Sequence, residues 1–321
     1  MLQIKIYLLN SLFMLILVII MNMIVVAFST LFERKIMGLF HIRKGPNKML
    51  FIGLSQPFND ALKLLSKELY KPLISNLFMY LITPYCMLMM NLLIWVIYPF
   101  YSNLIIYKFN MLLFLCIMSM SVYMLMFNGW VSNSNFTMIG AIRSIAQSIS
   151  YEIIFSVIIL ILMIYINSFN FLMLLFLNKY CYLIFFFFNS SFFFLVSILA
   201  EINRTPFDLS ESESELISGF NIEYGSKNFV FIFLAEYSSI MFMMMMFNML
   251  FMFISMNMFF YINMILLFFI ITWIRMTFPR MRYDNLMFMC WLYLLPFILL
   301  NFIYYVMLKY NLDMYLYNYN N

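Results

Sequence analysis

The sequence of 321 residues contains very little charge. Only 10% of its residues are Asp, Glu, Lys or Arg, whereas 66% are hydrophobic and the mean hydropathy is +0.97. A typical soluble domain has about 25% charged residues. Because this chain has too few polar residues to cover a water-exposed surface, its composition excludes a soluble enzyme, a secreted disulfide scaffold and a disordered chain. The composition indicates a protein that crosses a membrane several times.

Residues that bind metals and redox cofactors are also scarce. The chain has a single histidine, His41, and its four cysteines lie far apart in apolar stretches. Iron–sulfur clusters need several thiolates at set spacings, and a bis-histidine haem needs a second histidine. The same scarcity leaves no set of His and Cys ligands for a zinc site. Neither of the two common glycine-rich phosphate-binding motifs occurs in the sequence. We therefore expect no metal site and no covalently bound cofactor, and we expect any electron carriers to lie on other subunits.

Long apolar runs predict an all-α polytopic membrane protein with about eight transmembrane helices, because each crossing takes about 20 residues. The expected spans are 6–31, 72–98, 104–127, 143–167, 180–200, 229–248, 256–276 and 286–308. The stretch from Phe229 to Ile274 contains no Lys or Arg, and we expect it to turn back around Asn248–Asn257. The chain is expected to form one membrane domain, 1–321, with long inner loops at 32–71, 201–228 and 275–285.

The distribution of positive charge predicts the orientation of the chain. Fourteen of the 18 Lys and Arg residues lie in the loops after the first, third, fifth and seventh expected spans. The positive-inside rule places these loops on the inner side and both termini on the outer side. Of the 13 acidic residues, only Asp313 lies on the outer side. The net charge of +5 is therefore explained by topology, and we expect membrane lipids but no nucleic acid as partners.

The first inner loop contains a stretch with helical periodicity, residues 56–69. Phe58 and Leu62 lie on one face of the expected helix, whereas Asp60, Lys63 and Lys67 lie on another. This pattern predicts an amphipathic surface helix. The helix could anchor the loop to the membrane, or it could cover the entrance of an amphiphilic ligand, and the residues alone leave both interpretations open.

Acidic residues provide the strongest candidates for function. Glu152 and Glu236 lie inside expected spans, where an ionisable group costs several kcal/mol unless it is paired or hydrated. Desolvation should make such groups able to exchange protons, although a polar contact between helices is the alternative. The loop 201–228 carries a further acidic series, Glu201, Asp208, Glu211, Glu213 and Glu215. Alternate carboxylates repel one another and share protons, although a solvated acidic loop is again the alternative.

The last inner loop is basic and contains Arg275, Arg280 and Arg282. Its charge is explained by topology alone, but arginine also holds carboxylates and polarises carbonyl groups such as those of a quinone.

The inner loops contain motifs that match those of one known family, in the same order and along the whole chain. The motifs include Phe32–Lys35, Arg43–Asn47, Gln56–Phe58, Gly129–Asn135, Gly140–Arg143, Ala200–Leu209, Glu213–Leu216, Gly219–Tyr224 and Phe278–Asp284. In these motifs the chain resembles chain 1 of the proton-pumping NADH–ubiquinone oxidoreductase, respiratory complex I, in its mitochondrial form. Two positions depart from the family: Leu50-Phe51 replaces a common Gly-Pro pair, and Ser212 stands where glycine is common.

The resemblance implies a core membrane subunit of a translocase in the mitochondrial inner membrane, with both termini in the intermembrane space. Such a subunit binds ubiquinone as substrate and has no redox centre of its own. NADH, FMN and iron–sulfur clusters are implied on other subunits, and the implied partners are the hydrophilic-arm quinone-module subunits and the antiporter-like membrane subunits.

The resemblance also implies roles for particular residues. The implied quinone-tunnel residues are Glu33, Arg34, Asp60, Phe229, Phe233, Arg275 and Arg282. The implied proton and charge relay consists of Tyr151, Glu152, Glu201, Asp208, Glu211, Glu213, Glu215 and Glu236.

Two other classes of function fit the composition. A secondary transporter would use intramembrane acids near the midplane, but the chain shows no internal repeat and its acids cluster toward one side. A structural membrane anchor would have little use for the acids inside the expected spans. Co-migration in mild detergent distinguishes these classes, because a transporter would run alone or as a homo-oligomer and a complex I subunit would run in a very large assembly.

Overall fold

The computed structural model describes residues 2–73, 75–99, 108–209, 219–253 and 255–320, without the side chains of residues 2–6, 8 and 316–320. Within these ranges the regular structure is entirely helical, which confirms the predicted all-α class. The α-helices are α1 (Leu2–Phe40), α2 (Gln56–Ser66), α3 (Leu77–Ile94), α4 (Asn110–Val131), α5 (Asn135–Ile166), α6 (Phe171–Tyr180), α7 (Leu183–Phe186), α8 (Phe188–Glu201), α10 (Ser226–Phe247), α11 (Met258–Thr277), α12 (Tyr283–Phe288) and α13 (Leu295–Asn320). Short 3₁₀ turns occur at η1 (Phe51–Gly53), η2 (Trp95–Ile97) and η3 (Gly219–Asn221), and π-helical turns at η4 (Asn248–Met252) and η5 (Met289–Leu294).

Seven helical segments in the described part of the chain are long and apolar enough to cross a membrane. They are Leu9–Phe40, Leu77–Ile97, Asn110–Val131, Asn135–Ile166, Ser226–Met252, Met258–Thr277 and Tyr283–Tyr315. They correspond to seven of the eight expected spans. The expected span 180–200 is instead divided into α7 and α8 at Phe187, where the backbone leaves the helical region (φ −106°, ψ 41°). The 14 residues of α8 extend only about 21 Å, less than the ~30 Å hydrocarbon core.

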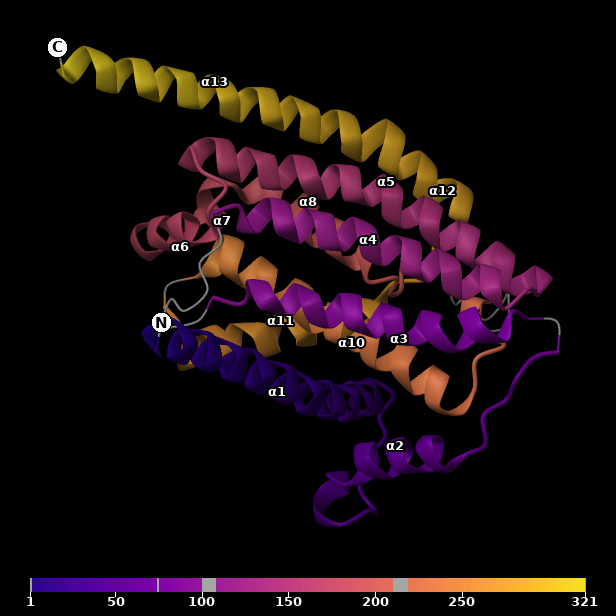
Figure 1. Ribbon diagram of the computed structural model, residues 1–321. Coiled ribbons are helices and arrows are strands. Elements are labelled where there is room, and N and C mark those ends of the chain that lie inside the picture. The colour runs from indigo at the N-terminus through magenta and orange to yellow at the C-terminus, as the bar shows by residue number, and fades with distance from the viewer. Residues whose placement is uncertain (1, 74, 100–107, 210–218, 254, 321) are drawn as a thin grey trace.

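The short helix α8 nevertheless carries the chain along the bundle. Figure 1 shows that α5 ends at one end of the bundle and that α10 begins at the other, with α8 running between them. In the part of the chain that the structure describes, α8 thus adds an eighth pass to the seven long segments. Both termini lie toward the same end (Figure 1). We call this the outer end, and we call the opposite end, where α1 ends and α10 begins, the inner end. The orientation of these ends in a membrane stays a prediction.

Three helices continue farther toward the inner end than the hydrophobic runs predict. Helix α1 extends to Phe40 instead of ending near Leu31, α5 begins at Asn135, and α10 begins at Ser226. Glu33-Arg34-Lys35 are good helix formers, so the polar residues continue α1 rather than ending it. Consequently, the side chains of Glu33 and Arg34 are fixed by a long helix.

The core of the bundle is built around α5 and α10. Their apolar segments are 50% and 56% buried, whereas those of α1 and α13, which flank the bundle on opposite sides in Figure 1, are only 17% buried. Aromatic rings from α5, α8 and η4 fill the outer half. Phe155 and Phe194 are stacked with centroids 4.7 Å apart, and Phe194 meets Phe251 edge-on at 5.5 Å. The chain turns back between α10 and α11, as predicted for Asn248–Asn257.

Candidate functional site

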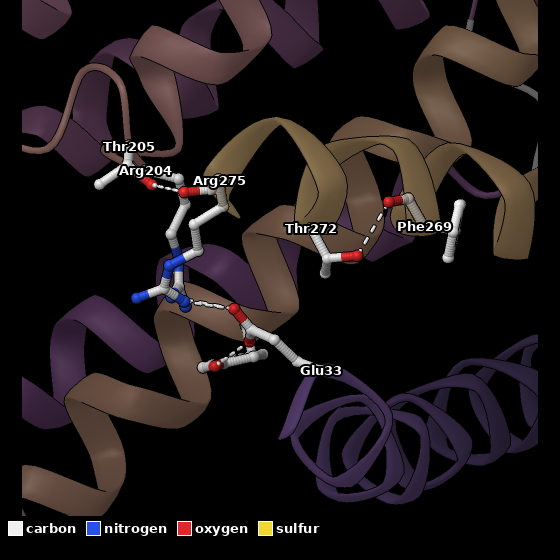
Figure 2. A network of polar contacts seen from close by, with 7 residues as sticks. Glu33, Arg204, Thr205, Phe269, Thr272 and Arg275 are labelled. Carbon is white, nitrogen blue, oxygen red and sulfur yellow. Dashed lines mark hydrogen bonds and ion pairs between the residues drawn. The ribbon is translucent and has the colours of Figure 1, made fainter. Parts of the chain in front are cut away.

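A buried carboxylate, that of Glu33 on α1, lies at the centre of the polar contacts at the inner end. Its residue is only 4% exposed. Arg275 at the end of α11 donates a hydrogen bond to Oε1, and an Nη1 atom of Arg204, from the loop after α8, lies 3.7 Å from the same oxygen. Tyr237 on α10 donates to Oε2 at 2.5 Å. Figure 2 shows the two guanidinium groups side by side and directed toward Glu33.

These contacts offset the cost of burying the carboxylate. An ion taken out of water is tolerated only where charges and hydrogen bonds replace its hydration. The guanidinium carbon of Arg204 also lies 4.7 Å from the ring centroid of Tyr237, a cation–π geometry. Burial by itself lowers the pKa of Arg204, but Tyr237 and Glu33 raise this pKa above its ordinary value, so Arg204 stays charged. The Thr205 hydroxyl donates to the carbonyl of Arg275 at 3.3 Å and joins the two arginine-bearing segments.

An aromatic row on α10 leads to the Glu33 cluster. Phe229, Phe233 and Tyr237 follow one another at intervals of four residues, which places them on one face of the helix. The ring centroids of Phe229 and Phe233 are 6.0 Å apart, and those of Phe233 and Tyr237 are 4.5 Å apart. Because Tyr237 donates its hydrogen bond to Glu33, the apolar row ends directly at the ionic cluster.

A second ion pair joins α1 to α2. Arg34 Nη1 and Asp60 Oδ2 are 2.6 Å apart, and Gln56 donates to the other carboxylate oxygen of Asp60 at 3.0 Å. The side chains of Arg34 and Asp60 are 48% and 36% exposed, so this pair is far more hydrated than Glu33. Arg282 lies apart from both groups and forms an exposed ion pair with Asp284 at 3.1 Å. Six of the seven expected tunnel residues therefore lie on α1, α2, α10 and α11, and Arg282 does not join them.

A polar cavity adjoins the Glu33 cluster inside the bundle. It has a volume of about 50 Å³, and its lining includes Glu201, Arg204 and Glu236 together with Asn91 and Ser121. A water molecule needs about 10–15 Å³ of such space, so the cavity can hold a few water molecules. Arg204 contributes to both places, because it lines the cavity and approaches Glu33.

The expected relay residues divide into three sets. Glu201 and Glu236 line the cavity, and Glu152 on α5 is close enough to Glu201 for the two charges to interact. Tyr151 is fully buried beside Glu152, and Asp208 is buried in an ion pair with Arg280 at 3.1 Å. The remaining three expected residues, Glu211, Glu213 and Glu215, lie outside the described residues.

The loop between α1 and α2 contains left-handed backbone at the position that departs from the family pattern. Leu50 and Ile52 have φ angles of 43° and 55°, which cost roughly 1–3 kcal/mol each in residues other than glycine. At Gly53 (φ 80°) a Cβ atom would lie 2.1 Å from the carbonyl oxygen of Pro46, so only glycine fits. Lys35 donates to the Ile52 carbonyl at 2.8 Å and ties this loop to α1.

Arg204 and Tyr237 were not expected as site residues. Helical periodicity gave a signal for Tyr237, because it lies four and eight residues after Phe233 and Phe229. No local signal in the sequence distinguishes Arg204 from the other inner arginines.

The sequence matches the family model described as NADH dehydrogenase over residues 13–306. The chain belongs to the NADH dehydrogenase family. It is similar to the NADH-ubiquinone oxidoreductase chain 1 of Locusta migratoria, with 48% identity over 290 residues that cover 90% of this chain and 92% of the relative. The chain 1 of Aedes aegypti is 46% identical over 281 residues, covering 87% and 90%. That of Apis mellifera ligustica is 41% identical over 299 residues, covering 92% and 96%.

Membership of the NADH dehydrogenase family makes the chain part of an oxidoreductase complex. The matched region contains both ion-paired groups and the polar cavity. Among the described residues, no three His, Cys, Asp or Glu side chains are grouped closely enough to hold a metal ion. The candidate functional site of this family member is the set of ion-paired and cavity-lining groups at the inner end.

Proposed function

We propose that this chain lines the path by which ubiquinone reaches its reduction site and passes the resulting change in charge into the membrane. The relatives' names supply the substrate and the assembly, an NADH–ubiquinone oxidoreductase. The observation that carries the proposal is the aromatic row of α10, which ends at a buried, doubly paired carboxylate.

This arrangement suits the chemistry of an amphiphilic quinone. The long apolar tail can lie along aromatic rings such as those of Phe229 and Phe233, whereas the carbonyl head group needs hydrogen-bond donors. Arg275 and Tyr237 are donors at the end of the row, and both now hold Glu33. Arg34 and Asp60, joining α1 to α2, belong to the same path in this proposal. Arg282, which pairs with Asp284, lies at the edge of the proposed quinone path.

In this proposal the relay begins at Arg204, which belongs to both the Glu33 cluster and the lining of the polar cavity. A reduced quinone must gain protons, and a change in charge near Glu33 alters the balance of charge at Arg204. Arg204 borders the cavity that also exposes Glu201 and Glu236, and Glu201 interacts in turn with Glu152. Carboxylates separated by space for water can exchange protons, so this series provides a route from the quinone site into the bundle. Tyr151, Asp208, Glu211, Glu213 and Glu215 complete the proposed relay.

The remaining parts of the proposal concern partners and location. A chain of this family has its NADH, FMN and iron–sulfur chemistry on hydrophilic-arm subunits, and it passes charge to antiporter-like membrane subunits. Its location is then the mitochondrial inner membrane, and proton translocation is the output of the assembly. Support comes from the position of the buried ion pairs, which lie at the inner end of an otherwise apolar bundle.

A double substitution, Glu201→Gln with Asp208→Asn, tests the proposal. Groups that transfer protons contribute about 10²- to 10⁴-fold to a rate, so we expect quinone reductase turnover to fall roughly tenfold or more. Assembly should change less, because both amides keep the shape of the carboxylates. Turnover is measured on the complex purified in mild detergent, with NADH oxidation by ferricyanide as the readout for the NADH-oxidising part.

Asp313→Asn is the matched control, because Asp313 is an exposed acid at the outer end. We expect this variant to behave like the unaltered complex. Normal quinone reduction and normal proton pumping in the assembled double variant would contradict the proposed relay.

A further inference from the structure

Gln147 on α5 joins two parts of the loop that follows α8. The residue is fully buried, and its Nε2 atom donates to the carbonyl oxygens of Ala200 and Phe207, both at 2.7 Å. A side-chain amide nitrogen has two hydrogens, so these bonds use both of them. The Oε1 atom has no hydrogen-bond partner among the described residues, which leaves donation as the contribution of this amide.

The two accepting carbonyls belong to the residues that directly precede Glu201 and Asp208. A peptide group is planar, so fixing the carbonyl of one residue also fixes the nitrogen and Cα of the next. The Gln147 side chain therefore fixes the backbone nitrogen and Cα of both Glu201 and Asp208, two of the proposed relay residues. Each carbonyl also accepts a backbone hydrogen bond, that of Ala200 from Asn203 N at 3.2 Å and that of Phe207 from Leu209 N at 3.0 Å. Gln147 therefore adds a second bond to each oxygen and links the two carbonyls to α5.

Other contacts hold the same loop against α5 and the last inner loop. The rings of Phe207 and Tyr151 lie 5.8 Å apart, and the backbone nitrogen of Met281 donates to the carbonyl of Pro206 at 3.0 Å. Beyond residues 210–218, the chain returns to α5 at Gly140, where an added Cβ would lie 3.1 Å from the backbone of Gly219. Helix α5 is thus the surface on which this loop is positioned.

We propose that Gln147 is a positioning residue that sets the separation between the Glu201 and Asp208 carboxylates. The inference rests on the proposed relay, because it assigns a purpose to the geometry of those two acids. A glutamine suits this role since it supplies two donors without a charge. A lysine or arginine in its place would pair with the carboxylates and alter their protonation.

The test begins with Gln147→Met, which removes both donors and approximately keeps the volume, in the assembled complex. We expect kcat for quinone reduction to fall roughly 10- to 100-fold, the loss that a misplacement of about 1 Å can cause. The KM for quinone and the ferricyanide rate should stay unchanged. Gln147→Asn, which keeps the amide but is too short to reach both carbonyls, should give an intermediate kcat.

Ser148→Ala is the matched control. Ser148 is a buried donor on the same turn of α5, but among the described residues its hydroxyl bonds only to the carbonyl of Ile145 in its own helix. We expect its kcat to be unchanged. Normal kcat in the assembled Met or Asn variant would overturn the inference, and so would failure of both variants to assemble, because that result would assign Gln147 a structural role.

A double-mutant cycle separates this inference from the proposed function. If Gln147 acts through Glu201 and Asp208, then Gln147→Met should cause no further loss in the Glu201→Gln/Asp208→Asn background. A full further loss in that background would overturn the positioning role while leaving the relay intact. Normal activity of the Glu201→Gln/Asp208→Asn variant itself would instead contradict the proposed function.

Discussion

The inner and outer ends of the bundle are held together by different interactions. At the inner end, Glu33 and Asp208 are buried in ion pairs with Arg275 and Arg280. At the outer end, Phe194 packs against rings of three neighbouring segments and is fully buried. Both ends belong to the same helices, because α5 and α10 run through the whole bundle.

Polar side chains at the outer end serve the backbone. Asn178 of α6 donates to the carbonyls of Met249 and Leu250 in η4, at 2.9 and 3.0 Å. These carbonyls lie where a π-helical turn ends and would otherwise lack partners. Lys309 of α13 similarly donates to the carbonyl of Ile164 in the last turn of α5. Each of these contacts completes a helix end.

The difference between the two ends favours a functional role for the charged groups at the inner end. Replacing a buried ion pair by well-packed apolar residues is often neutral or stabilising by about 1–4 kcal/mol. Charged groups inside a membrane are therefore a poor means of holding helices together, and their presence favours a functional role. The outer end shows that this chain can pack its helices with aromatic side chains and with polar groups that bond to neutral oxygens.

Glu33→Gln should produce the largest effect, and it tests most directly whether the inner ion pairs serve function rather than packing. The substitution removes the negative charge that Arg204 and Arg275 share. Removing one partner of a buried ion pair costs about 3–5 kcal/mol, and half of this cost, if present in the transition state, lowers kcat/KM roughly 10- to 100-fold. Quinone reductase activity of the assembled complex measures the effect, and the yield of complex measures stability.

The matched control is Glu68→Gln, which neutralises an exposed acid at the inner end. We expect activity and yield to stay unchanged in this variant. If Glu33→Gln lowered only the yield and left turnover per assembled complex intact, the ion pairs would hold the structure in the same way as the outer aromatic core.

Phe194→Ala should produce the second effect, and it acts on stability alone. Removing a fully buried phenylalanine costs about 3–5 kcal/mol, so we expect a lower thermal midpoint and a lower yield of complex. Turnover per assembled complex should stay normal, because Phe194 lies at the outer end. Thermal inactivation of the purified complex provides the measurement.

Phe192→Ala on the same helix controls for loss of an aromatic ring, because Phe192 is 58% exposed. Its thermal midpoint should change little. A large loss of turnover in assembled Phe194→Ala would show that the outer core takes part in the reaction and would remove the contrast between the two ends.

Periodicity and hydropathy predicted the helical part of the fold well, because the membrane imposes strict requirements on helices. Seven expected spans correspond to long helices, since each unsatisfied backbone group in lipid costs several kcal/mol. The break at Phe187 was not predicted, because an aromatic run such as Phe185–Phe188 contains no Gly or Pro that would signal it. The extension of α1 past Leu31 was missed for a related reason, since hydropathy detects lipid contact and not helix formation.

The site was predictable as a set of residue types but not as a set of contacts. The buried acids stood out because charge is rare in this chain. Their partners could not be identified, because Glu33 and Arg275 are 242 positions apart and every inner arginine fits the positive-inside rule equally well. Gln147 could not be identified from the sequence, because a neutral amide does not stand out by charge. Its proposed role depends on hydrogen bonds to two backbone carbonyls of a distant loop.

Arg34→Gln should produce the smallest effect. It compares an exposed ion pair of the inner end with the buried ion pairs of Glu33. Arg34 lies within hydrogen-bonding distance of Asp60, but both side chains are at least a third exposed. Exposed pairs contribute only about 0–1 kcal/mol, so the thermal midpoint should hardly move. If the pair borders the quinone path, the KM for a long-tailed quinone should rise while kcat stays within about twofold, as expected for loss of uniform binding. Lys63→Gln, an exposed cation on α2, should leave both constants unchanged. If kcat fell as much as in Glu33→Gln, the exposed Arg34–Asp60 pair would contribute to turnover in the same way as the buried Glu33 pairs, and not only to quinone binding.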